Sequence, residues 1–270
     1  MDKREYYKLL EEPAGDRNRK QAWDIRAKEF FGYSKGSQDG AIMAFLKDHM
    51  EIAGKRILDI GCGSGRFLIP FVKLGAQVTG IDISSEMLKQ AVRLAEEEGI
   101  DPASYQLHKI GWDEFDPDPE GYDLVFASMS PGISDWKSIE KALHTTREGL
   151  YISSFAHRRE PLFDHMRQLY KSAPPKDWQS RFRGMINLLM LEGYFPDVKF
   201  LTRRTDSETD PEKLALKMAP RLVEGIVTQE KLQEIEGTIR EELVRNGNAN
   251  PTERIVGMLY VDTRLRRGIL

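Results

Sequence analysis

The sequence predicts an α/β fold built on a doubly wound, mostly parallel sheet of seven strands. Three observations indicate this fold. Short apolar segments alternate with helical patterns between residues 54 and 155. The first apolar segment ends in a glycine-rich turn that opens a helix, and the second ends in an acid. Strands that alternate with helices imply right-handed crossovers, which place the strands parallel in one sheet.

The expected strands are apolar runs bounded by turn residues. They span residues 56–60, 77–82, 105–110, 122–128, 149–155, 198–202 and 254–262. Helices are expected over much of residues 1–53, between the central strands, and from residue 156 to about 192 with an interruption at two prolines. Ser84 or Ser85 is placed to cap the helix that carries Met87 and Leu88.

A polar connection of roughly 50 residues separates the last two expected strands. Asp210-Pro211 is a good helix start, and Thr228 is placed to cap a second helix that runs to Val244. A connection of this length usually forms a lid or an accessory subdomain. We therefore divide the chain into an N-terminal helical lid (1–53), a core (54–207), a helical insertion (208–250), and a last strand and tail that complete the core (251–270).

The composition is that of a globular protein without a strongly charged partner. Of 270 residues, 40% are hydrophobic and 31% are charged, so the chain can bury a core and remain in solution. The net charge of −3 argues against a nucleic-acid partner. We expect a cytoplasmic protein that does not enter membranes, because no long apolar run and no signal-peptide core are found. A single cysteine, Cys62, excludes an internal disulfide.

The sharpest motif is a glycine-rich turn that is followed, one strand later, by an acid. The turn reads Asp59-Ile60-Gly61-Cys62-Gly63-Ser64-Gly65, and Asp82 ends the next strand. Glycines let the backbone approach a ligand closely, and the helix that follows directs free N–H groups at it. Asp82 is placed to accept hydrogen bonds from a ribose diol, a spacing that also suits NAD. The pattern is not G-x-G-x-x-G, however, and Asp59 would repel a pyrophosphate but suits a cationic amino-acid ligand.

These residues make the chain resemble the class I S-adenosylmethionine-dependent methyltransferases of the small-molecule type. The resemblance rests on Leu58–Gly65, on Val78–Ser84 and on Glu86-Met87-Leu88, and it is strongest over residues 54–155. It implies S-adenosyl-L-methionine as the cofactor. It also implies a Rossmann-like methyltransferase sheet in the order 3-2-1-4-5-7-6, with an antiparallel seventh strand. A glycine turn in another nucleotide-binding fold is the alternative.

The resemblance assigns cofactor contacts to particular residues. The turn would hold the methionine end of the cofactor, Asp82 would bind the ribose hydroxyls, and Ile83 would pack on the adenine. The turn residues concerned are Asp59, Gly61, Cys62, Gly63 and Gly65.

Further cofactor contacts are implied outside these two segments. In the loop after the third strand, Asp113 would take the adenine amino group and Trp112 would stack on the base; an acidic turn is the alternative. Ser128 ends the fourth strand and would line the cavity. Trp23 and Tyr33 belong to a W-D-x-x-A lead-in that resembles a helix closing over the cofactor; a surface helix packed on the sheet is the alternative.

The substrate side is expected near the ends of the fourth and fifth strands. Met129 and Ser130 follow the fourth strand, at the position that faces the transferred methyl group in related folds. The segment lacks the N/D-P-P-Y/F signature of enzymes that methylate amino groups of nucleic acids and proteins. His157 would be a general base, and Arg158 or Arg159 would hold an acidic group of the substrate. A solvated helix start is the alternative for this segment.

Taken together, the residues favour methyl transfer from S-adenosyl-L-methionine to a small molecule whose acceptor atom is O, N, S or C. An RNA or protein methyltransferase and a relative that binds the cofactor without catalysis are the alternatives. We expect no metal, since the histidines show no metal-binding spacing. The apolar residues of the 208–250 insertion suit a lid or a homodimer interface equally well.

Overall fold

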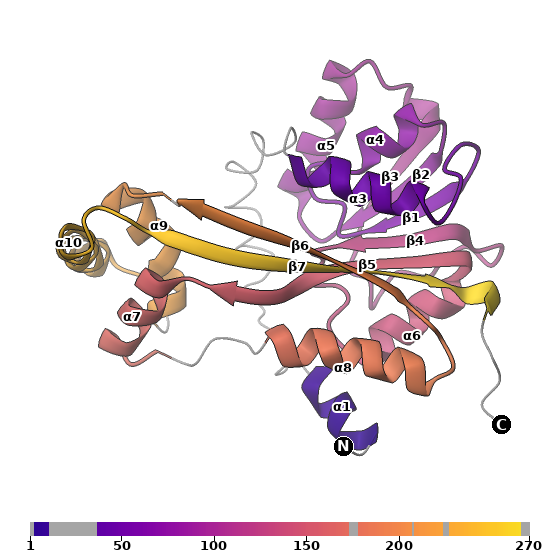
Figure 1. Cartoon of the computed structure of the whole chain (residues 1–270). Helices are drawn as coiled ribbons and strands as arrows, with labels where there is room; N and C mark the ends of the chain where they lie inside the picture. The colour runs from indigo at the N-terminus through magenta and orange to yellow at the C-terminus, as the bar shows by residue number, and fades with distance from the viewer. Residues whose placement is uncertain (1–2, 11–36, 173–177, 207, 224–226, 266–270) are drawn as a thin grey trace. The chain divides into compact units, whose positions relative to one another are not determined.

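The computed structural model describes residues 3–10, 37–172, 178–206, 208–223 and 227–265 (Figure 1). Its helices are α1 (Lys3–Leu10), α3 (Ser37–Lys47), α4 (Leu68–Lys73), α5 (Ser85–Glu97), α6 (Trp136–Thr145), α7 (Pro161–Leu169), α8 (Trp178–Leu191), α9 (Pro211–Leu222) and α10 (Gln229–Arg245). Its strands are β1 (Arg56–Ile60), β2 (Gln77–Asp82), β3 (Tyr105–Lys109), β4 (Tyr122–Ser128), β5 (Thr146–Arg159), β6 (Asp197–Asp206) and β7 (Pro251–Asp262). Short 3₁₀ turns span Pro102–Ser104 and Thr263–Leu265.

The strands form one sheet of seven strands in the order β3-β2-β1-β4-β5-β7-β6. β1 pairs in parallel with β2 and β4, β2 with β3, and β4 with β5. β7 runs opposite to β5, so the sheet is mixed (Figure 1). The seven-stranded Rossmann-like order expected from the sequence is therefore confirmed.

The centre of the sheet consists of strands that are buried on both faces. Leu58 of β1 and both Leu124 and Val125 of β4 are inaccessible to solvent. Near-continuous apolar sequence is typical of such strands, because helices cover both faces of a parallel sheet. Asp59 lies opposite Gly80 of β2 and Phe126 of β4. The carboxyl ends of these three strands therefore meet at the same edge.

Two segments differ from the prediction. β5 continues to Arg159, although the polar sequence after residue 155 suggested a helix start. In this extension Ala156 is buried, and the residues on either side of it are partly exposed. The long helical stretch expected from residue 156 is two described helices, α7 and α8. The helix expected at residues 21–31 lies outside the described residues.

Two helices follow β6 and precede β7. Asp210 begins α9 by accepting a hydrogen bond from the Glu212 N–H at 3.0 Å. Thr228 begins α10 in the same way, through the Lys231 N–H at 3.2 Å. Both caps were expected from the sequence. No described helix has the length and apolar character needed to span a membrane.

The chain groups into two compact units. Unit 1 contains residues 1–154, 181–199 and 257–270, and unit 2 contains residues 155–180 and 200–256. These ranges cross the four-part division drawn from the sequence, which remains a prediction.

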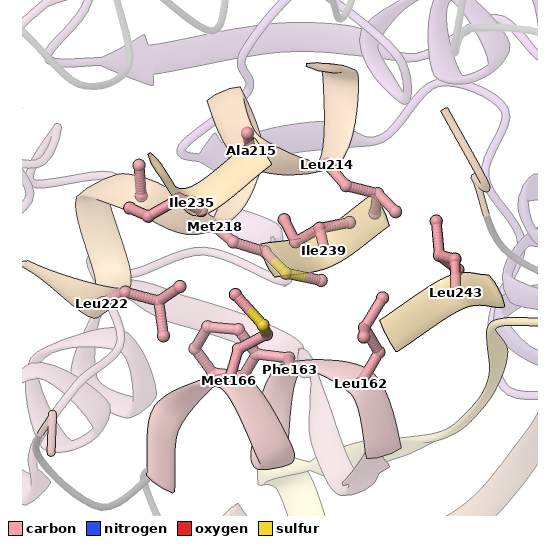
Figure 2. Packing of buried hydrophobic residues seen from close by; sticks show 11 residues of the cluster. Leu162, Phe163, Met166, Leu214, Ala215, Met218, Leu222, Ile235, Ile239 and Leu243 are labelled. Atoms are coloured by element: carbon pink, nitrogen blue, oxygen red, sulfur yellow. The ribbon is translucent and has the colours of Figure 1, made fainter. Parts of the chain in front are cut away.

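Unit 2 has its own apolar core between α7, α9 and α10 (Figure 2). Phe163 and Met166 of α7 face Met218 and Leu222 of α9, and Ile239 of α10 lies among them. Ile235 and Ile239 are inaccessible to solvent. Much of the apolar sequence of the 208–250 region is therefore accounted for by packing within unit 2.

The packing of the unit 2 core predicts how much stability is lost when one of its side chains is shortened. Ile239→Ala removes apolar volume from a site without solvent exposure, so we expect the free energy of unfolding to fall by about 2–5 kcal/mol. Val244→Ala, on the same helix but 68% exposed, is the matched control and should change stability by less than about 0.5 kcal/mol. Urea unfolding of both variants measures the difference. Equal effects would contradict the packing described.

Candidate functional site

The glycine turn after β1 depends on backbone conformations that glycine adopts readily. Gly61, Gly63 and Gly65 have φ angles of 72°, 55° and 82°. The N–H groups of Gly61 and Cys62 both donate to the Ile81 carbonyl, at 2.8 and 3.0 Å, and so tie the turn to β2. In addition, a side chain at Gly61 would clash with Ser130 Oγ. Glycine is thus required here both for dihedral angles and for close approach.

Asp82 connects the turn to the start of α5. Its Oδ2 accepts a hydrogen bond from the Gly63 N–H at 3.0 Å, and its Oδ1 accepts one from the Ser84 N–H at 2.8 Å. Ser84 in turn caps α5 through the Met87 N–H at 3.2 Å. An ionised carboxylate acts only as an acceptor, which is the role that the two hydroxyl groups of a diol require of a partner.

Asp59 is a buried acid with an unsatisfied oxygen. It is 2% exposed, and its Oδ2 has no hydrogen-bond partner among the described residues. Burial, reinforced by the negative charge of Asp82, raises the pKa of Asp59 to about 8. Such a group is stabilised by a cationic partner, because an unpaired buried carboxylate is costly. The site therefore fits a ligand that carries an ammonium group.

Cys62 occupies the turn as a small buried side chain. It is 5% exposed, and a side chain at Gly80 would come within 2.9 Å of its Sγ. Burial first, and the charges of Asp59 and Asp82 second, hold the pKa of the Cys62 thiol well above its usual value. The thiol is therefore neutral and packs as an apolar group beneath the turn.

The loop after β3 brings Asp113 and Ile83 to the same place. A Cβ at Gly111 would lie 2.6 Å from Asp113 Oδ1 and 3.6 Å from Ile83 Cγ2. Trp112 takes a different position from the one expected. It is 3% exposed, its indole N–H donates to the Ser138 carbonyl at 3.0 Å, and Lys141 Nζ lies 4.4 Å from its ring centroid. A buried ring with these contacts presents no face on which a base can stack.

The end of β4 carries Ser128, Met129 and Ser130. The Ser128 and Ser153 hydroxyls are 3.0 Å apart, and the Met129 N–H donates to the Ser153 carbonyl at 2.9 Å. Met129 has a φ angle of 55°, which is unusual for a residue with a side chain, and it is 36% exposed. Strained backbone that displays a side chain is often found at functional sites. Through Ser130 Oγ, this segment lies directly beside Gly61.

Two of the remaining predicted residues, His157 and Arg158, lie within β5. His157 lies inside β5 instead of after a strand, and it makes no hydrogen bond or ion pair to another described residue. Arg158 binds Glu160 at 2.7 Å. Trp23 and Tyr33 lie outside the described residues. Within the described ranges, no group of three or more metal-binding side chains occurs.

Ser153 and Gly132 are site residues that sequence reasoning missed. Ser153 bonds the end of β4, and a Cβ at Gly132 would come within 3.1 Å of Ile60 Cγ2 and 3.4 Å of Trp112 Cβ. The position of Gly132 in a loop directly after a strand was the signal available for it.

Asp59 makes the stability of the ligand-free protein depend on pH. Its folded pKa of about 8 lies above the unfolded value of about 3.9. The folded state therefore binds the additional proton between these values, and the free energy of unfolding falls as pH rises through that range. We expect Asp59→Asn, which cannot ionise, to match the wild type near pH 5 and to exceed it by roughly 4 kcal/mol near pH 8.5, because each pH unit in this range changes the free energy of unfolding by about 1.4 kcal/mol.

Urea unfolding at both pH values measures this difference. Asp101→Asn, at an exposed acid that accepts one backbone hydrogen bond, is the control. A difference between Asp59→Asn and wild type that is the same at both pH values would contradict the raised pKa.

Part of this chain is similar in sequence to known proteins. A family model described as a methyltransferase domain matches residues 57–150. A ubiquinone biosynthesis O-methyltransferase of Bradyrhizobium sp. is 42% identical over 110 residues, which are 41% of this chain and 38% of that protein. Its counterpart from Chromobacterium violaceum is 35% identical over 102 residues, 37% of this chain and 43% of that protein. The aligned part thus covers less than half the length of either relative.

Solved structures show the same fold. A methyltransferase from Thiobacillus denitrificans in complex with S-adenosyl-L-homocysteine superposes with a TM-score of 0.56 at 15% identity, over 91% of this chain and 99% of that one. The YcgJ protein of Bacillus subtilis superposes with a TM-score of 0.58 at 14% identity, over 86% and 100% of the two chains. These findings show that residues 57–150 match a methyltransferase domain and that the chain has the seven-stranded fold of the solved structures.

Proposed function

We propose that this protein transfers the methyl group of S-adenosyl-L-methionine to a small-molecule acceptor. The observation that carries the proposal is the unsatisfied, buried Asp59 carboxyl beside a glycine turn that Asp82 holds in place. An acid of this kind suits the amino group of a methionine moiety. The Asp82 carboxylate, at the end of the next strand, is a hydrogen-bond acceptor of the kind that suits a ribose diol.

In this proposal, different residues of unit 1 contact different parts of the cofactor. The glycine turn holds the methionine end, with Cys62 filling the space beneath it. Asp82 receives the ribose, and Ile83 and Asp113 flank the adenine. Ser128 supports the turn-facing end of β4. The turn residues are Asp59, Gly61, Cys62, Gly63 and Gly65.

The cofactor supplies an electrophilic methyl group on a sulfonium, so the protein mainly has to position an acceptor in line with it. Met129 and Ser130 are proposed to line the acceptor side, since Ser130 adjoins the turn at Gly61. His157 is proposed as a base for an acceptor that must lose a proton. The names of the relatives, which are O-methyltransferases, favour a hydroxyl acceptor.

Calorimetric titration with S-adenosyl-L-methionine and S-adenosyl-L-homocysteine tests the cofactor site. We expect saturable binding, and we expect Asp82→Asn to weaken it at least about tenfold, because a hydrogen bond to a charged group contributes about 1.5–3 kcal/mol. Asp101→Asn should bind like wild type. Asp101 precedes β3 and so lies near the amino end of that strand, whereas the glycine turn and Asp82 lie at the carboxyl ends of β1 and β2. Folded wild-type protein that binds neither compound would refute the proposed function.

A further inference from the structure

Unit 2 contains a cluster of four basic side chains around one buried acid. Glu160, which directly precedes α7, is ion-paired with Arg158 at 2.7 Å, with Arg254 at 3.2 Å and with Arg221 at 3.3 Å. Lys217 of α9 borders the same cavity. The arginines come from β5, α9 and β7, so the cluster exists only in the folded unit.

Glu160 is ionised within this cluster. Its side chain is 11% exposed, and burial alone would raise its pKa. The three arginines outweigh burial and hold the pKa of Glu160 below its usual value. The negative charge of Glu160 is therefore shared by three arginines, and Lys217 adds a further positive charge at the same cavity. The second acid at the cavity, Glu208, is already engaged by Lys213 at 3.6 Å and by the Thr209 and Asp210 N–H groups.

Donors in the cluster remain unused. The Nε groups of Arg158 and Arg254 are buried and have no hydrogen-bond partner among the described residues. Lys217 makes no hydrogen bond within the described part of the chain. Loss of hydration and then the charges of Arg254, Arg158 and Arg221 lower the pKa of Lys217. A network that served the fold alone would be expected to pair its charges, because uncompensated buried charge is destabilising.

The space between these side chains is a cavity of about 20 Å³. A cavity of this size admits one or two small polar atoms, and its rim is basic. We propose that this cavity and its basic rim receive one or two oxygen atoms of a single oxyanion group, a carboxylate or a phosphate, of a small molecule. The proposal concerns unit 2 alone and holds whether or not the protein transfers methyl groups.

The roles of the individual residues follow from their contacts. Arg221 stacks on Phe163, with its Cζ 3.6 Å from the ring centroid, and is thereby fixed in position. Glu160 orients the three guanidinium groups. Lys217 is exposed on α9 and has no partner to hold it elsewhere, so it is the group that an entering anion would recruit. Its substitution also leaves the apolar core of unit 2 intact.

Thermal unfolding of the full chain in sodium phosphate, sodium acetate and sodium chloride at matched ionic strength tests the proposal. Lys217→Gln removes one charge from the cavity. Arg240→Gln, at a 63% exposed arginine that pairs with Glu236 on α10, removes the same charge elsewhere. A ligand that binds the folded state raises the unfolding temperature in a saturable way.

In wild type and Arg240→Gln, we expect phosphate or acetate to raise the unfolding temperature above that in chloride, with saturation. Lys217→Gln should require at least about tenfold more anion for the same rise, as expected for the loss of a charged hydrogen bond. Without anion it should unfold at or above the wild-type temperature, because repulsion in the cluster is relieved. The anion that reaches half of its full effect at the lower concentration shows whether the bound group is a phosphate or a carboxylate. Identical curves for the two variants, or no rise above chloride, would overturn the proposal.

Discussion

The carboxylate of Asp82 determines the arrangement of the cofactor site. By accepting hydrogen bonds from Gly63 and Ser84, it joins the glycine turn after β1 to the first turn of α5. The Ile81 carbonyl adds two further bonds to the same turn. Since β2 supplies both residues, the parallel pairing of β1 with β2 fixes the position of the turn. Because Gly61 closely approaches Ser130, the segment that follows β4 is positioned against the same turn.

The central strands were predictable because local sequence determines them. β1, β2 and β4 have the predicted bounds: each is a run of apolar residues that ends at a turn or an acid. The continuation of β5 through His157 was not predictable in this way, because this part of the strand is polar and only partly buried. Trp112 was assigned to the ligand by its place in the loop, but the backbone carbonyl of Ser138, from α6, pairs with its indole. Contacts between segments far apart in the sequence decide such cases.

The basic cluster of unit 2 is a second feature that depends on contacts between distant segments and could not be predicted from local sequence. Arg158, Arg221 and Arg254 are separated by many residues, and no sequence pattern connects them. Only the fold brings them to one carboxylate. The apolar residues of α9 and α10 were visible in the sequence, but their purpose was not. The structure uses them to build a core with α7, which supports the residues that carry the charges.

Cys62 gives the glycine turn an intrinsic reporter. It is the one cysteine in the sequence, it is buried against Gly80, and its raised pKa keeps the sulfur protonated. The thiolate is the form of cysteine that reacts with alkylating reagents and peroxide, so the folded protein should be inert to both. Modification would require the turn to open. The rate at which a thiol reagent labels this protein is therefore a direct measure of how often its cofactor-binding turn comes apart.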